Sequence, residues 1–220
     1  PVQTVEITSE NQDTPEERAA FDFLYASTKA TKAEPNVHLN FNHAMSRVNL
    51  KFVPGTDPEG NPVTLTDIEC YLVGIKRNGT FDTETGVAAV TEDAAVSDLR
   101  QMLNADNDYT FTAYLLPQTI GAEGLQIEAA MTTADGRRIY YFLEIPVSDW
   151  PEMKAGYSYN YTLTANDYMT ASPTVLEISG TDINPWTEVN KEETPDAKAL
   201  GTEAYVNGAE WGEMENEEIV

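Results

Sequence analysis

Cysteine and histidine are scarce in this 220-residue chain, and their scarcity excludes several kinds of site. Cys70 is the only cysteine, so the chain forms neither an internal disulfide nor a metal site made of several thiolates. Because Cys70 lies within an apolar strand pattern, we expect a small buried hydrophobic residue there. His38 and His43 are the only imidazoles that could act as a catalytic base, and we expect a structural role for both.

Sequence motifs that carry chemistry are also missing. The segment 156–160 lacks the second glycine of a nucleophile elbow, and the chain has no glycine-rich phosphate loop. The acidic segments 82–84 and 106–108 lack the glycine and the terminal glutamate of an EF-hand loop. The sequence therefore predicts no catalytic residue, no cofactor and no dedicated metal site, and we do not expect an enzyme.

Basic residues are few, and long hydrophobic runs are absent. Thirteen lysines and arginines stand against 37 acidic residues, which gives a net charge of -24. A surface of this charge repels phosphate backbones and anionic lipids, so nucleic acids and membrane surfaces are poor partners. No stretch approaches the roughly 18 apolar residues of a membrane span. The chain starts at Pro1 without a signal-peptide pattern, so we expect either a removed targeting segment or a trimmed chain.

Alternating apolar residues are what the sequence has instead. They recur with a period of two in stretches such as 125–131, 139–145 and 157–163, which is typical of half-buried strands. Because turn residues separate these stretches and no strand–helix alternation is present, we predict an all-β fold, an antiparallel β-sandwich over about residues 37–186. Its expected core residues are Phe41, Leu50, Leu72, Ile75, Leu115, Ile127, Leu143 and Tyr159.

One or two short helices are expected within this β fold. Thr14-Pro15-Glu16-Glu17 has the pattern of a capping box with proline at the first helical position, starting a helix through Phe21 and Leu24. Residues 91–104 repeat apolar side chains at spacings of three and four, which favours a second helix.

Two local features are expected along the strands. Arg77-Asn78-Gly79-Thr80 has the composition of a tight hairpin turn. The apolar positions change parity between residues 37–41 and 48–52, so we expect a bulge or kink near Ser46 and Arg47. We expect His43 and Arg47 to be structural.

The tyrosines at 157, 159 and 161 share one face of a strand and allow two interpretations. They could form a sugar-stacking platform, or pack into the core with their hydroxyls at the rim, which we favour.

The chain divides into three parts by composition. Residues 1–36 contain the first strand, the short helix and a polar linker, residues 37–190 form the sandwich, and residues 191–220 form an acidic tail. The tail has nine acidic and two basic residues, and it is either solvated and flexible or a donor strand for a neighbouring subunit. In the second case Tyr205, Ala209 and Trp211 have matching parity and would be the side chains that contact the neighbour.

Several segments together give a resemblance to a known family. They are Asp22-Phe23-Leu24-Tyr25-Ala26, residues 39–50, Gly79-Thr80-Phe81-Asp82, Leu115-Leu116-Pro117-Gln118, Trp150, Ala155-Gly156-Tyr157-Ser158-Tyr159 and Ile183-Asn184-Pro185-Trp186. In this order and spacing the chain resembles the fimbrillin-like surface pilins of Bacteroidota, the type V pili and their relatives, over residues 22–186. Members of that family normally carry a further N-terminal sandwich domain and a lipid-bearing cysteine near the start. Only 21 residues precede Asp22 here and Cys70 cannot be that anchor, so we expect either that this chain is mostly the second domain or that the first domain has been removed.

The resemblance implies a transthyretin-like sandwich, export as an outer-membrane lipoprotein precursor, and assembly with other fimbrial subunits by strand exchange. The expected function is therefore a structural or accessory subunit of a cell-surface fimbria that contributes to adhesion. The alternative is a surface module that binds a glycan or a protein, as a tip adhesin or a lectin does. A polymerising subunit should offer an open sheet edge, whereas a lectin should offer exposed aromatic side chains around one pocket.

Overall fold

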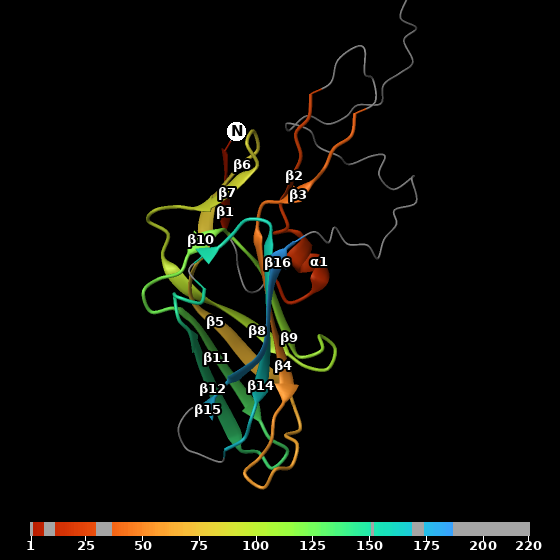
Figure 1. Cartoon of the computed structure of the whole chain (residues 1–220), viewed down its shortest axis with the longest axis vertical. Coiled ribbons are helices and arrows are strands. Elements are labelled where there is room, and N and C mark those ends of the chain that lie inside the picture. Colours follow the sequence, from red (N-terminus) through yellow and green to blue (C-terminus); the bar gives the residue numbers. More distant parts are fainter. Residues whose placement is uncertain (1, 7–11, 30–36, 151, 169–173, 187–220) are drawn as a thin grey trace, which may run out of the picture.

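Two stacked β-sheets form the body of the protein. The computed structural model describes residues 2–6, 12–29, 37–150, 152–168 and 174–186 (Figure 1). The five-stranded sheet has the order β15 (Thr174–Val175), β12 (Arg138–Ile145), β11 (Leu125–Thr132), β5 (Ile68–Lys76) and β8 (Val96–Leu103). The four-stranded sheet has the order β16 (Glu177–Pro185), β14 (Tyr157–Ala165), β4 (Ser46–Pro54) and β9 (Thr110–Leu115).

Three smaller sheets and one helix complete the described part of the chain. They are the sheet of β1 (Val2–Glu6), β6 (Asn78–Asp82) and β7 (Val87–Val90), the pairs β2 (Leu24–Tyr25) with β3 (Asn42–His43) and β10 (Gln118–Thr119) with β13 (Glu152–Met153), and α1 (Pro15–Ala19). The β2–β3 pair and the β1-β6-β7 sheet lie toward the upper end of the molecule (Figure 1). The predicted all-β class is confirmed. Most pairings are antiparallel, but β14 pairs with β4, and β12 with β15, in parallel.

The core lies between the two main sheets and follows the alternation of their strands. In β4 every second residue from Ser46 to Phe52 is buried, and β14 buries Tyr159, Tyr161 and Leu163 in the same way. Trp150 is buried against this layer, with its ring centroid 4.7 Å from that of Tyr159. Seven of the eight predicted core residues are buried, and the exception is Phe41.

The predicted place of Phe41 in the core is wrong, because the residue is 48% exposed. Residues 37–41 are not in a strand, and β3 contains only Asn42 and His43. The chain then passes through Ala44 and Met45, which are buried but unpaired in a ladder, before β4 begins at Ser46. The parity change is therefore a break between two strands, and β4 pairs with β9 in regular register from Ser46 onward.

The predicted helix at 91–104 is also wrong, because residues 96–103 form strand β8 on the edge of the five-stranded sheet. Leu99 and Leu103 are both fully buried. Their spacing of four residues fits one face of a strand as well as one face of a helix, so the sequence pattern is ambiguous. Pairing with β5 decides in favour of the strand. Val96, which would share the buried face of a helix with Leu99 and Leu103, is 62% exposed.

The expected hairpin at 77–80 is a crossover between sheets instead. Asn78 and Gly79 lie inside β6, which pairs with β1 and β7 and not with β5. Gly79 is required by close packing, since a Cβ there would collide with the backbone carbonyl of Ala89. The reversal of the chain comes later, at residues 83–86 between β6 and β7.

The capping box before α1 is confirmed. The Thr14 side chain accepts a hydrogen bond from the backbone N–H of Glu17, and the Glu17 carboxylate accepts one from the backbone N–H of Thr14. The helix is shorter than expected and ends at Ala19, because Leu24 pairs with His43 in the β2–β3 ladder.

Candidate functional site

The tail residues expected to contact a neighbouring subunit, Tyr205, Ala209 and Trp211, lie outside the residues that the structure describes. Within the described part, three features bear on function: an aromatic cluster at one end of the sandwich, the free edges of the sheets, and a hollow on the outer face of the five-stranded sheet. In the same part of the chain, no group of three His, Cys, Asp or Glu side chains is placed to hold a metal ion. No helix there is long and apolar enough to cross a membrane.

The aromatic cluster is centred on Trp186, directly after β16. Its ring stacks on that of His43 with 3.6 Å between centroids, and the Arg47 guanidinium lies 4.8 Å from the indole centroid. His43 Nδ1 is 2.6 Å from an oxygen of Asp22, so the segment before β2, β3 and the end of β16 are held together. Arg47 Nε donates to Ser158 Oγ at 2.9 Å. These contacts fit the structural role expected for His43 and Arg47.

The tyrosine row on β14 belongs mainly to the core. Tyr159 and Tyr161 are 3% and 4% exposed, and burial raises the pKa of Tyr161 to about 12. The Tyr159 hydroxyl, at the rim, donates to the carbonyl of Glu152 and accepts from the backbone N–H of Lys154, both at 2.9 Å. Two of the three rings are therefore out of reach of a sugar, as the core interpretation requires.

The outer edge of β9 is closed by two buried glutamine side chains. The Gln101 amide accepts from the backbone N–H of Thr112 at 3.0 Å and donates to the carbonyl of the same residue at 2.6 Å. The Gln12 amide likewise accepts from the backbone N–H of Tyr114 at 2.8 Å and donates to the carbonyl of Tyr114 at 3.2 Å. An amide that accepts and donates at one residue imitates the backbone of a neighbouring strand, so the edge of β9 is occupied.

The opposite edge of the same sheet has no such closure among the described residues. β16 pairs there only with β14, and every residue of β16 except Gly180 is exposed. Its exposed apolar side chains include Ile178 and Ile183, at 43% and 40%. A nine-residue edge strand with free backbone groups is a template on which another strand can pair.

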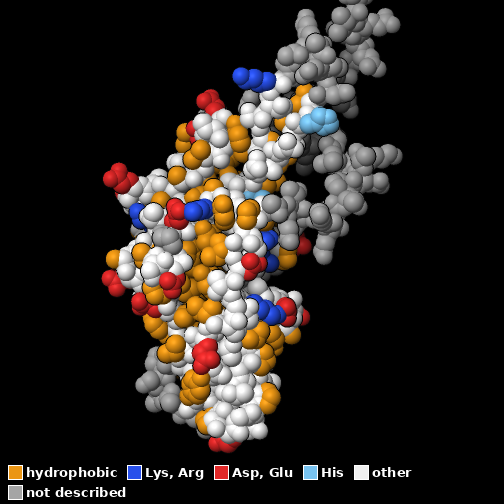
Figure 2. Space-filling model, viewed as in Figure 1, with side chains coloured by type: hydrophobic (Ala, Val, Ile, Leu, Met, Phe, Trp, Pro, Cys, Tyr) orange, Lys and Arg blue, Asp and Glu red, His pale blue; other side chains and the backbone are white. Residues whose placement is uncertain are grey.

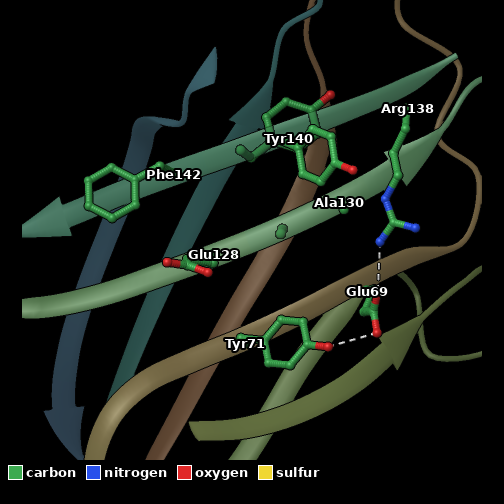
Figure 3. A pocket seen from close by; sticks show the side chains of 9 residues that line it. Glu69, Tyr71, Glu128, Ala130, Arg138, Tyr140 and Phe142 are labelled. Atoms are coloured by element: carbon green, nitrogen blue, oxygen red, sulfur yellow. Dashed lines mark hydrogen bonds and ion pairs between the residues drawn. The ribbon is translucent and has the colours of Figure 1, made fainter. Parts of the chain in front are cut away.

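The hollow lies on the outer face of the five-stranded sheet, with a volume of about 440 Å³. Two rows of side chains form it. One row runs across β5, β11 and β12 through Tyr71, Glu128 and Phe142, and the next contains Ala130 and Tyr140 (Figure 3). Because Ala130 is small and lies between larger neighbours, the surface is hollowed above it.

A charged network holds one wall of the hollow in place. The Glu69 carboxylate accepts hydrogen bonds at 2.8 Å from the Tyr71 hydroxyl, Arg100 Nε and an Arg138 nitrogen. Figure 3 shows Tyr71 and Arg138 both pointing toward Glu69. The hydrogen bond from Arg100, followed by that from Tyr71, lowers the pKa of Glu69 to about 2. The carboxylate is therefore charged and fixed at neutral pH.

Sequence reasoning missed this hollow. The prediction used the apolar side chains that point inward within 139–145, such as Tyr141 and Leu143. It did not use the aromatic side chains at the positions between them. Tyr140 and Phe142 occupy the outward positions of β12, where polar residues are usual in a strand with one solvated face. Aromatic residues on both faces of one strand are the signal that could have found the site.

Comparisons with known proteins agree with this architecture. Residues 2–186 match the family described as fimbrillin-like. A candidate cell adhesion protein from Bacteroides ovatus has a similar structure, with a TM-score of 0.65 and 23% identity over 84% of this chain and 60% of that one. A second, from Bacteroides uniformis, has a TM-score of 0.59 and 20% identity over 84% of this chain and 66% of that one.

At these identities the two structures establish the fold alone, and the chain spans less than two thirds of the length of either. The comparison with curated proteins gives no match. The family match covers most of the sequence and all the described strands. The chain therefore belongs to the fimbrillin-like family.

Proposed function

We propose that the protein is a structural or accessory subunit of a bacterial cell-surface fimbria, which assembles by strand exchange and contributes to adhesion. The observation that carries this proposal is the fimbrillin-like match over residues 2–186. Two proteins of similar fold are described as candidate cell adhesion proteins, which supports the same role. The protein is not an enzyme in this proposal, and it reaches the cell surface as an outer-membrane lipoprotein precursor.

The strand edges suggest where a neighbouring subunit would bind. The edge of β9 is occupied by Gln12 and Gln101, whereas the edge of β16 offers backbone groups to a partner strand. A strand added there would gain main-chain hydrogen bonds along the edge, while alternate side chains supply specificity. We assign the accepting role to the edge of β16.

Residues 202–214 are the proposed donor segment. They hold an apolar cluster within an acidic tail, and the side chains of Tyr205, Ala209 and Trp211 would all point to one face of an extended strand. Val206 would point to the other face. The partners of this protein are accordingly other fimbrial subunits, of the same or another kind.

Deletion of residues 201–220 tests the donor segment. The truncated chain should be a folded monomer, whereas the full chain should form a ladder of oligomers in size-exclusion chromatography and filaments in electron micrographs. Trp211→Ser should weaken assembly and Val206→Ser should not, because only the first side chain enters the neighbour. If the truncated chain assembles like the full chain, the tail is not the donor.

A further inference from the structure

We propose that the outer face of strands β5, β11 and β12 binds a neutral oligosaccharide chain. This inference deepens the adhesion part of the proposed function and rests on it. The site consists of the hollow above Ala130 and of a second hollow that adjoins it. Tyr140 and Phe142 provide the apolar contacts, and Glu128 and Arg138 provide polar ones.

The shape of the site fits a chain ligand. The second hollow has a volume of about 410 Å³ and shares Glu69, Ala130 and Arg138 with the first. The Glu69–Arg138 ion pair therefore separates two adjoining spaces, each of a size that holds a small ligand (roughly 300–1,000 Å³). We call the two hollows together the groove, and two spaces that adjoin across an ion pair suit a ligand of several linked units better than a single compact one.

The aromatic side chains are placed for stacking. Tyr140 is 56% exposed, and Phe142, two residues along β12, is half-buried on the same face. The Arg138 guanidinium lies 5.4 Å from the centroid of the Tyr140 ring, so one ring face is already covered by a cation. Aromatic rings that stay partly in water gain free energy when the C–H face of a sugar ring displaces that water.

The polar groups favour a ligand with hydroxyls and no net charge. Three carboxylates line the two hollows, from Asp67, Glu69 and Glu128, and Arg138 lines both. Arg138 and Arg100 both pair with Glu69, and together with Asp67 and Glu128 the carboxylates outnumber these two cations, so the site has no excess positive charge for an acidic sugar. Glu128 is exposed and can accept from sugar hydroxyls, and Arg138 can donate to them. Figure 2 shows acidic and basic side chains scattered over the face that it views, and the net charge of -24 of the whole chain adds a general repulsion of anionic ligands.

A peptide is less suited to this face. β5 and β11 have a strand on both sides, and β12 pairs with β11 along its length and with the two-residue β15 at Tyr141 and Phe142, so the groove lies over the face of the sheet and not along an edge. An extended peptide gains most of its affinity from main-chain hydrogen bonds to a free sheet edge, and this groove offers none. Binding to this face must therefore depend on side chains. Sugars bind in this way, by stacking on aromatic rings and by hydrogen bonds between their hydroxyls and polar side chains.

Affinity electrophoresis of the full chain tests the inference. The gels contain a neutral glucan, mannan, galactan or xylan, or the acidic polygalacturonate as a comparison. At least one neutral polysaccharide should retard the protein. Tyr140→Ala should lower the affinity for that polysaccharide, obtained from the retardation at several polysaccharide concentrations, at least tenfold, because it removes an exposed ring. Ala130→Leu should do the same by filling the hollow while leaving every polar group in place.

Tyr168→Ala is the matched control, since Tyr168 is 44% exposed and lies outside the groove. Its retardation should equal that of the unchanged protein. The inference would be overturned if Tyr140→Ala and Ala130→Leu were retarded as strongly as Tyr168→Ala and the unchanged protein. Retardation of the unchanged protein by polygalacturonate alone, or by none of the polysaccharides, would overturn it as well.

Assembly of the same variants separates this inference from the proposed function. Chromatography should show unchanged oligomers for Tyr140→Ala and Ala130→Leu, since the groove is on the five-stranded sheet and β16 is at the edge of the four-stranded one. If both variants lose assembly, the face is a contact between subunits, which overturns the sugar site and leaves the fimbrial role standing. Conversely, retarded protein that never assembles supports the sugar site and counts against strand exchange.

Discussion

Replacing Gln101 by methionine tests whether a side-chain amide holds the β9 edge. Methionine keeps the length and volume of the side chain but removes both polar groups. Three hydrogen bonds are lost: the one that Gln101 donates to the backbone carbonyl of Gln12 at 2.8 Å, and the pair with Thr112. Gln101 is 3% exposed, so water does not readily replace the amide. At about 1 kcal/mol for each hydrogen bond, the free energy of unfolding should fall by about 3 kcal/mol.

Urea denaturation followed by tryptophan fluorescence measures this loss. With a slope of about 2 kcal/mol per molar, the midpoint should move down by about 1.5 M while the slope stays constant. Gln3→Met is the control, because Gln3 is exposed on β1, and its effect should stay within about 0.5 kcal/mol. A midpoint shift for Gln101→Met below about 0.5 M would refute the reasoning, since the edge would then not depend on the amide.

The remaining predictions concern acid, packing and thiol chemistry. Because the pKa of Glu69 is lowered to about 2, its stabilising effect is complete above its ordinary pKa of 4.5 and is lost as the pH falls toward 2. The stability difference between the unchanged protein and Glu69→Gln, from urea titrations, should therefore be constant from pH 5 to 7 and shrink below pH 4.5; a difference that grows in acid contradicts this. Trp186→Ala should cost about 3 kcal/mol in calorimetry, because it removes a ring stacked on His43, whereas Trp186→Phe should cost clearly less. The Cys70 thiol is fully buried, which raises its pKa, so a thiol reagent should label it only in denaturant; rapid labelling of the native protein would show that β5 opens.

The sequence predicts the inner layers of this fold better than its ends. Strands such as β11, β12 and β14 alternate regularly because one face is buried. A period of two in the sequence then identifies which side chains of the strand face the core. Residues 37–41 alternate just as well, yet Phe41 is exposed, because no second sheet covers them in the described structure. At residues 96–103 the prediction failed for another reason. A spacing of four residues fits both a helix and a strand, and only the pairing with β5 shows that the segment is a strand.

The candidate sites were harder to predict, for reasons of distance along the chain. The groove needs Tyr71, Ala130 and Tyr140 in neighbouring positions, and nothing in a single strand indicates which residues its neighbours supply. The closure of β9 by Gln12 has the same cause, since the residues that it joins are 102 positions apart. Local patterns predict elements, whereas both sites arise from pairing between elements.

The parallel pairing of β4 with β14 has a consequence for how the chain folds. It joins Asn49 to Asn160 across 111 positions, and it forms the centre of the four-stranded sheet. Closing so long a loop is slow, because its entropy is lost before the strands gain any contact. The hairpin of β11 and β12 forms early by comparison, and β4 can pair with β9 on one side, while its other side waits for β14, which is synthesised after β12. A chain that crosses a membrane from its N-terminus would thus emerge with the β14-facing edge of β4 unpaired, and chaperones that cover exposed strand edges would find it in that interval.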